Sequence, residues 1–195
     1  MAASLPLLLF AFLGLFSPGP NIVMLTASGA RFGFRATIPH LLGVPVGVGI
    51  IAAITGTGVG AALESAPGLT LAFKIAAALW ILWLAWKTAQ AGHAGRGQDR
   101  GRPMTFLEAV AFQAINPKIW AITLAASAAF TIGLSAPAEA VRMFAAFAGI
   151  NLFVCAFWTA MGHGLRRALA SDLLWRRFMT LMACAMAATV ILIFV

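Results

Sequence analysis

The sequence predicts an all-α membrane protein of six transmembrane helices, arranged as two inverted three-helix repeats with broken first and fourth helices. Three observations carry this prediction. Hydrophobic residues make up 62% of the chain and charged residues only 9%, whereas a soluble domain is about 45–50% apolar and about 25% charged. Six apolar segments are each long enough to cross a bilayer. Two of them, one in each half of the chain, are interrupted by proline motifs.

The six apolar segments account for most of the chain, and each is near the ~20 residues that a spanning helix needs. They are 4–27, 38–61, 69–91, 105–130, 138–161 and 177–195. Only short loops remain, which leaves no room for a separate soluble domain. We therefore expect one transmembrane domain, 1–195, made of a first repeat (1–92), a cytoplasmic basic loop (93–104) and a second repeat (105–195).

The first segment, MAASLPLLLFAFLGLF, has no Lys or Arg before its apolar run, so we expect a retained helix and not a cleaved signal peptide. Positive charges lie in the first, third and fifth loops, and Lys and Arg mark the cytoplasmic side. Both termini are therefore predicted to be periplasmic. A first segment that re-entered instead of crossing would make the N-terminus cytoplasmic. The basic residues of these loops are Arg31, Arg35, Lys87, Arg96, Arg100, Arg102, Arg166, Arg167, Arg176 and Arg177.

Two of the basic loops have a further character. The third loop, AGHAGRGQDRGRP, is rich in glycine and is expected to be a flexible linker. The stretch GLRRALASDLLWRR after His163 mixes Leu and Trp with Arg. It fits either a short helix along the cytoplasmic interface or a plain basic loop.

The two halves of the chain resemble each other in arrangement. Each opens with an apolar segment broken by a proline motif, SPGPN at 17–21 and INPK at 115–118, and two further spans follow each break. The offset between the halves is about 99 residues. A repeat with an odd number of spans must insert its second copy upside down, as in many secondary transporters.

The first break leaves backbone groups without helical partners. Pro20 has no N–H and its ring clashes with the carbonyl four residues earlier, and Pro18 adds a second interruption, so carbonyls around Leu15 and Phe16 lose their donors. Gly19 adds backbone freedom. Unpaired backbone groups survive in a membrane only where protein or a polar cavity covers them. The break therefore predicts a polar cavity near mid-membrane.

The second break places a cation inside the bilayer. Asn116, Pro117 and Lys118 lie well inside their span, and the break frees a carbonyl near Gln113. A lysine facing lipid at that depth is strongly disfavoured, so Lys118 must face inward and be paired, solvated or bound to an anion. Half-helices that begin after the two breaks would aim their positive ends at the cavity.

A cavity of this kind suits a zwitterionic amino acid. Its carboxylate would meet Lys118, and its ammonium would meet amide oxygens and freed carbonyls. The alternative for the prolines is that they only kink packed helices. Asn151 lies inside the fifth span, and its alternative role is a hydrogen bond to a neighbouring helix. The predicted substrate-binding residues are Pro18, Gly19, Pro20, Asn21, Gln113, Asn116, Pro117, Lys118 and Asn151.

The motifs at the breaks also carry a family resemblance. FSPGPN at 16–21, GFR at 33–35, WILWLAWK at 80–87 and NPK at 116–118, together with the glycine-rich second span, resemble the LysE/RhtB superfamily of bacterial amino-acid exporters. WLAWK and the stretch GHGLRRAL resemble its cysteine/O-acetylserine branch most. The resemblance implies export of small amino acids or derivatives, such as cysteine, O-acetylserine, homoserine or threonine, across the inner membrane. It also implies proton antiport without a cofactor.

Three ionisable residues are candidates for proton coupling, each with a simpler alternative. Glu108 opens the fourth span and can equally be an ordinary acid on a first helical turn. His40 and His163 lie at cytoplasmic ends of spans, where histidines also anchor helices at the interface. Gly43 and Gly47 form a close-packing pair that suits either internal packing or a homodimer face.

Other functions have less support in the sequence. The net charge of +8 is spread over short loops, which is a topology signal and not a nucleic-acid surface. The histidines and cysteines have no metal-ligand spacing, and no nucleophile–base pair or phosphate loop suggests an enzyme. A thiol-redox conduit through Cys155 and Cys184, or a passive pore, remain as alternatives. The expected partners are a small amino acid, protons and membrane lipid.

Overall fold

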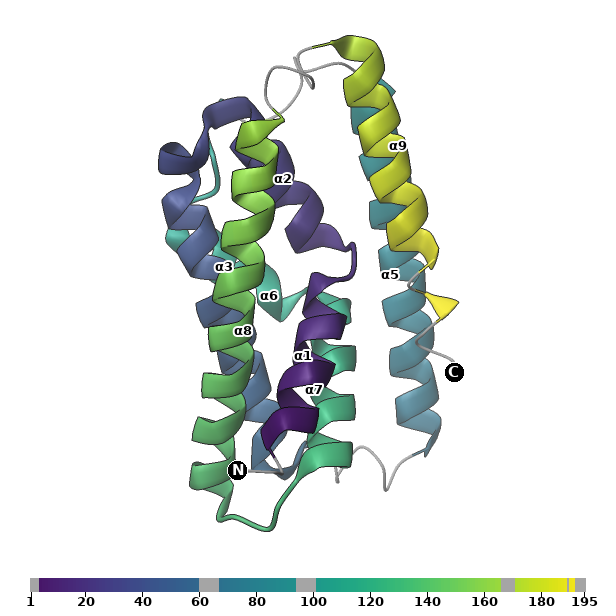
Figure 1. Ribbon diagram of the computed structural model, residues 1–195. Coiled ribbons are helices and arrows are strands. Elements are labelled where there is room, and N and C mark those ends of the chain that lie inside the picture. Colours follow the sequence, from purple (N-terminus) through teal and green to yellow (C-terminus); the bar gives the residue numbers. More distant parts are fainter. Residues whose placement is uncertain (1–3, 60–66, 94–100, 166–170, 189, 192–195) are drawn as a thin grey trace.

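The computed structural model describes residues 4–59, 67–93, 101–165, 171–188 and 190–191 (Figure 1). Within these ranges the chain forms eight α-helices and one short π-helix, and no strand. They are α1 (Ser4–Phe16), α2 (Pro20–Phe32), α3 (Phe34–Ile54), η1 (Thr55–Val59), α5 (Pro67–His93), α6 (Phe106–Ala114), α7 (Pro117–Phe130), α8 (Ala136–Gly164) and α9 (Asp172–Ala188).

Three parts of the described chain meet the length and apolarity of a membrane span. α3 with its π-helical extension (Phe34–Gly58) and α8 are long and apolar enough individually. α1 and α2 meet the same test only as a pair, which is bent by 59° at the first proline motif. Within the described residues the chain therefore has two candidate spans, or three if the bent pair crosses the membrane once.

Both predicted breaks are present. α1 ends at Phe16 and α2 begins at Pro20, with extended backbone at Gly19 between them. α6 ends at Ala114. α7 begins at Pro117, since the first turn of a helix accommodates a proline. Figure 1 shows the two connections side by side at mid-height of the bundle.

Several helix bounds differ from the apolar segments. α2 continues to Phe32, past the predicted end at residue 27, and only the turn at Gly33, with its positive φ of 87°, separates it from α3. α9 starts at Asp172 and not at 177, because Trp175 and Met179 pack against α2. Residues 172–177 thus belong to α9 and form no separate interfacial helix. The rest of that stretch and most of the third loop lie outside the described residues.

Close helix contacts explain the glycine pair. A Cβ on Gly43 would lie 2.4 Å from the Phe106 carbonyl, and one on Gly47 would lie 2.6 Å from Gln113 Cγ, so both glycines pack against α6. The two glycines therefore serve packing of α3 against α6 within one molecule and do not indicate a dimer face. α8 crosses α2 just as closely, because a Cβ on Gly162 would lie 2.1 Å from the Thr26 carbonyl.

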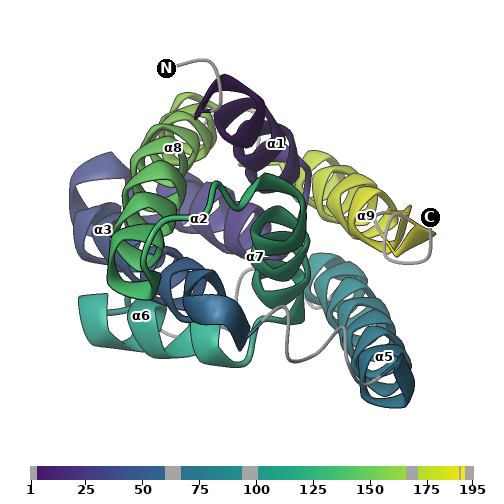
Figure 2. The same cartoon turned by 90° about the horizontal axis from the view of Figure 1, so that it is seen from below.

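The packing has a main bundle and an attached pair. α8 lies at its centre against α1, α2 and α3, with Met143, Phe147 and Val154 fully buried. α5 and α9 pack chiefly against each other and stand to one side of the bundle (Figure 2). The α2–α3 junction, the end of α5 and the start of α9 share one end of the molecule (Figure 1). These are elements that carry predicted cytoplasmic charges.

Candidate functional site

The two broken helices are joined by Lys118. Its ammonium donates to the Ser17 carbonyl at 2.5 Å, to Ser17 Oγ at 2.9 Å and to the Pro18 carbonyl at 3.3 Å. Lys118 is only 8% exposed, so it faces inward and is paired, as expected. The carbonyls that receive it belong to Ser17 and Pro18 and not to the helical residues just before them. These two carbonyls lie in the bend itself, where α1 has ended.

Gly19 permits this contact. A Cβ at Gly19 would lie 2.8 Å from both Cδ and Nζ of Lys118, closer than real Cβ contacts. The backbone of Gly19 is extended, a conformation that any residue adopts. Space for the lysine, and not backbone freedom, is therefore what requires glycine here.

A second bridge between the breaks consists of amides. Asn21 Nδ2 donates to Gln113 Oε1 at 2.8 Å, and Gln113 Nε2 donates back to Asn21 Oδ1 at 3.1 Å. Gln113 also donates to the Ala109 carbonyl and accepts from Asn116 Nδ2. Gln113 is fully buried and its amide is occupied, so it positions Asn21 and Asn116.

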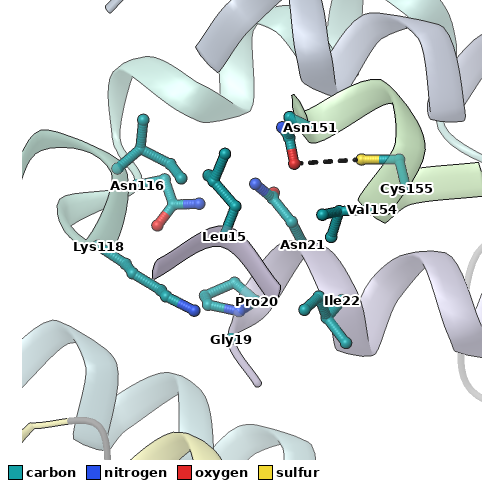
Figure 3. Close-up of a pocket in the computed structure, with 11 residues that line it drawn as sticks. Leu15, Gly19, Pro20, Asn21, Ile22, Asn116, Lys118, Asn151, Val154 and Cys155 are labelled. Carbon is teal, nitrogen blue, oxygen red and sulfur yellow. Dashed lines mark hydrogen bonds between the residues drawn. The ribbon is translucent and has the colours of Figure 1, made fainter. Parts of the chain in front are cut away.

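A small pocket lies beside Lys118 (Figure 3). Lys118 points toward Gly19 and Pro20 on one side, while Asn151 and Cys155 come from α8 on the other (Figure 3). The pocket has room for about one water molecule and not for an amino acid, and this conformation is called closed in that sense. Its lining residues are Leu15, Gly19, Pro20, Asn21, Ile22, Asn116, Lys118, Ile119, Asn151, Val154 and Cys155.

Two buried polar atoms at the pocket have no hydrogen-bond partner among the described residues. They are the acceptor Asn116 Oδ1 and the donor Asn151 Nδ2. Asn151 Oδ1 accepts a hydrogen bond from the Cys155 thiol at 3.6 Å, and both residues belong to α8. Among the described residues, the Asn151 side chain makes no hydrogen bond to another helix. Buried polar groups are normally paired. An unused donor and an unused acceptor therefore line the same pocket as the Lys118 ammonium.

The predicted binding residues have different positions relative to the pocket. Six of the nine line it, namely Gly19, Pro20, Asn21, Asn116, Lys118 and Asn151. Pro18 contributes its carbonyl to Lys118, Gln113 holds the amides, and Pro117 starts α7.

The proton-coupling candidates lie away from the pocket. Glu108 forms a capping box with Thr105 and accepts two hydrogen bonds from Arg102, which raise the pKa of that guanidinium. His40 is buried in α3, and its Nδ1 has no partner among the described residues. His163 is exposed near the end of α8. None of the three lines the pocket.

The sequence-based site omitted Ser17 and Cys155. Ser17 belongs to the first motif, but its role depends on the bend that turns its carbonyl toward Lys118. Cys155 lies four positions after Asn151, so a helix places both on one face. That spacing was a usable signal. The structure describes no group of three or more His, Cys, Asp or Glu side chains that could hold a metal.

Comparisons with known proteins find relatives that match most of this chain. Two relatives, each named cysteine/O-acetylserine efflux protein, are those of Shigella flexneri serotype 5b and Salmonella typhimurium. The first is 28% identical over 169 residues, covering 83% of this chain and 86% of its own. The second is 28% identical over 172 residues, covering 84% and 86%. No solved structure matches this chain.

The family match extends over almost the whole chain. Residues 12–194, which include both breaks, the pocket and the attached α5–α9 pair, match the family described as LysE type translocator. This family consists of transporters and not of enzymes. The chain therefore belongs to the LysE family of translocators.

Proposed function

We propose that this protein exports small amino acids or their derivatives across the bacterial inner membrane by proton antiport. Cysteine and O-acetylserine are the first candidates, because the relatives are named for their efflux. The observation that carries the proposal is the Lys118 ammonium held between two broken helices beside unpaired amide atoms.

The contacts of Lys118 suggest how a zwitterion would bind. In the closed form the Ser17 and Pro18 carbonyls receive an ammonium that belongs to the protein. A substrate ammonium can take the same carbonyls, while its carboxylate pairs with the displaced Lys118. Every charge then stays paired as the substrate enters, which a low-dielectric site requires.

The N-terminal ends of α2 and α7 add to the attraction for the carboxylate. Both helices begin at the breaks, where their unpaired N–H groups carry partial positive charge. Asn116 Oδ1 and Asn151 Nδ2 would serve the remaining polar groups of the substrate.

The packing supports six spans in two inverted repeats. Equivalent elements of the two halves contact each other: α3 packs on α8, α5 packs on α9, and the two breaks meet. Such pairing suits a pseudo-two-fold axis within the membrane plane. In this arrangement both termini are periplasmic, and the halves rock around the fixed site.

The direct test is metabolite profiling of the medium of cells that overexpress the chain. We expect extracellular cysteine, O-acetylserine or a related amino acid to rise above an empty-vector control. Lys118→Ala should abolish the rise while membrane insertion persists. Lys118→Arg should impair it, because a planar guanidinium does not replace a compact ammonium. Unchanged medium with wild-type protein, or normal export by Lys118→Ala, would contradict the proposal.

The alternatives have distinct outcomes. A passive pore would export equally after the proton gradient is collapsed, and the closed pocket gives it no support in this conformation. A thiol-redox conduit needs both cysteines. Cys155 is buried at the pocket, Cys184 is exposed on α9, and the two are not bonded. Full activity after replacing both with serine would exclude it.

A further inference from the structure

The pocket beside Lys118 has two chemically different walls (Figure 3). The wall formed by the two breaks carries the ammonium of Lys118 and the free acceptor Asn116 Oδ1. The wall formed by α8 carries Asn151, Val154 and Cys155. Every amino acid has the same ammonium and carboxylate, so groups that bind only these two do not distinguish one small amino acid from another. The α8 wall is therefore where differences between side chains can be recognised.

The pocket offers a substrate side chain no charged partner besides Lys118. Among the residues that the structure describes, only Lys118 brings a charge to the lining. Glu139 and Arg142, the buried charged residues of α8, bond to each other near the start of that helix and do not line the pocket. Burying a further charge here without a partner would be costly, so we expect an uncharged side chain. The apolar part of the lining is Leu15, Ile22, Ile119 and Val154.

Asn151 is the polar amide of the α8 wall. It is 3% exposed, and its Nδ2 donor is buried without a partner among the described residues. Its Oδ1 already accepts a hydrogen bond from the Cys155 thiol at 3.6 Å, one helical turn further on. The N–H group is therefore what the amide has left to offer. A buried donor without a partner is unfavourable, so a ligand that brings an acceptor to Nδ2 gains by pairing it.

We infer that Asn151 is a specificity-determining residue whose amide N–H donates to an oxygen acceptor on the substrate side chain, so that O-acetylserine is preferred to cysteine. The inference rests on the proposed function, in which the breaks bind the ammonium and the carboxylate. The ester carbonyl of O-acetylserine is an acceptor, and its methyl group suits the apolar lining. Hydroxyl side chains also accept, whereas a thiol is a weak acceptor. With cysteine bound, Asn151 Nδ2 remains poorly paired.

Cys155 is a positioning residue in this scheme, because it acts on the substrate through the Asn151 amide. Cys155→Ala removes the donor that occupies Oδ1 and lets the amide rotate. The preference for O-acetylserine over cysteine should then fall by about 2- to 5-fold, the equivalent of one weak hydrogen bond. Cys155→Ser supplies a hydroxyl donor at the same place and should restore the preference. Equal losses in both variants would contradict this role for the thiol.

The first test of Asn151 needs no substitution. Proteoliposomes with the full chain are loaded with O-acetylserine, with reduced cysteine or with O-ethylserine, which lacks only the carbonyl oxygen of the ester. The buffer is mildly acidic, so that the protonated amine does not attack the ester. The kcat/KM of efflux should be about 5–150-fold higher for O-acetylserine than for the other two, the cost of one unpaired buried donor. Equal values for O-acetylserine and O-ethylserine overturn the inference and leave export standing. Efflux of no amino acid at all would contradict the proposed function itself.

Asn151→Leu keeps the branched shape of the side chain and removes the amide. The kcat/KM for O-acetylserine should fall to the level of O-ethylserine, while that for cysteine changes by less than about twofold. Melting without substrate should not be lowered, because an unpaired buried donor is lost. An equal fall for all three substrates refutes the inference. If this variant does not insert, the comparison of substrates in the wild-type chain decides alone.

Thr159→Val is the matched control. Thr159 is also buried on α8 with an unpaired polar atom, its hydroxyl, but it does not line the pocket. This variant should keep the full preference for O-acetylserine. If Thr159→Val loses the preference as Asn151→Leu does, the effect comes from the packing of α8 and the inference is wrong.

Discussion

Gly19→Ala tests the contact between the two breaks with the smallest possible change. The new Cβ would lie 2.8 Å from Nζ and Cδ of Lys118. The lysine tip can bend away, but its ammonium is held by three oxygens of Ser17 and Pro18. We therefore expect at least one of these bonds to break. No backbone strain contributes, because residue 19 is already extended.

The size of the effect follows from the bonds lost. A hydrogen bond to a charged group contributes about 1.5–3 kcal/mol. Losing one would lower the population of the closed form relative to other conformations by about 10- to 150-fold, since 1.4 kcal/mol is about tenfold. In the proposed cycle the Lys118 contacts form again at every turn, so we expect transport per molecule to fall by about tenfold or more.

The assay is efflux of labelled O-acetylserine from proteoliposomes, with melting of the detergent-purified protein measured in parallel. The matched control is Gly149→Ala, where the new Cβ has no described atom within 4 Å apart from its chain neighbours and the backbone of its own helix. That change should leave transport intact and slightly favour the helix. If Gly19→Ala transports and melts like Gly149→Ala, the close contact with Lys118 does not govern transport.

Three further changes probe the surroundings of the site. Gln113→Leu should lower the melting temperature and transport together, because Asn21 and Asn116 lose buried partners at about 1–3 kcal/mol each; unchanged melting would mean that the amides pair elsewhere. Gly162→Ala should destabilise the protein by about 1–3 kcal/mol or more, because its Cβ would lie 2.1 Å from the Thr26 carbonyl; melting in detergent, compared with Gly149→Ala, checks this. Glu108→Gln should retain export, since glutamine preserves the cap on α6. Glu108→Ala should cost about 0.5–2 kcal/mol of stability. Loss of export by both variants, with normal folding, would restore Glu108 as a coupling residue.

The local features of the site could be predicted from the sequence. The proline motifs at 17–21 and 115–118 predicted a break in each segment, and α2 and α7 do begin at Pro20 and Pro117. A lysine within an apolar segment must face inward, and Lys118 does. The amides of Asn21, Gln113 and Asn116 could be predicted because they lie beside the breaks in the sequence.

Pairings between distant residues could not be predicted in this way. Asn21 and Gln113 are 92 positions apart, and their mutual hydrogen bonds depend on how the halves pack. The Ser17 carbonyl meets Lys118 only because the α1–α2 pair is bent by 59°. Arg142 was overlooked as part of an apolar segment, although its spacing from Glu139 is typical of a helical ion pair.

The lysine that occupies the carbonyls of the first break also bears on the return half of the cycle. An exporter releases its cargo and must then reset without one. Under the proposed binding mode the Lys118 ammonium occupies the carbonyls that a substrate amine would leave, so the reset does not expose an unpaired cation. A carrier that works in this way needs no second amino acid travelling inward to complete its cycle.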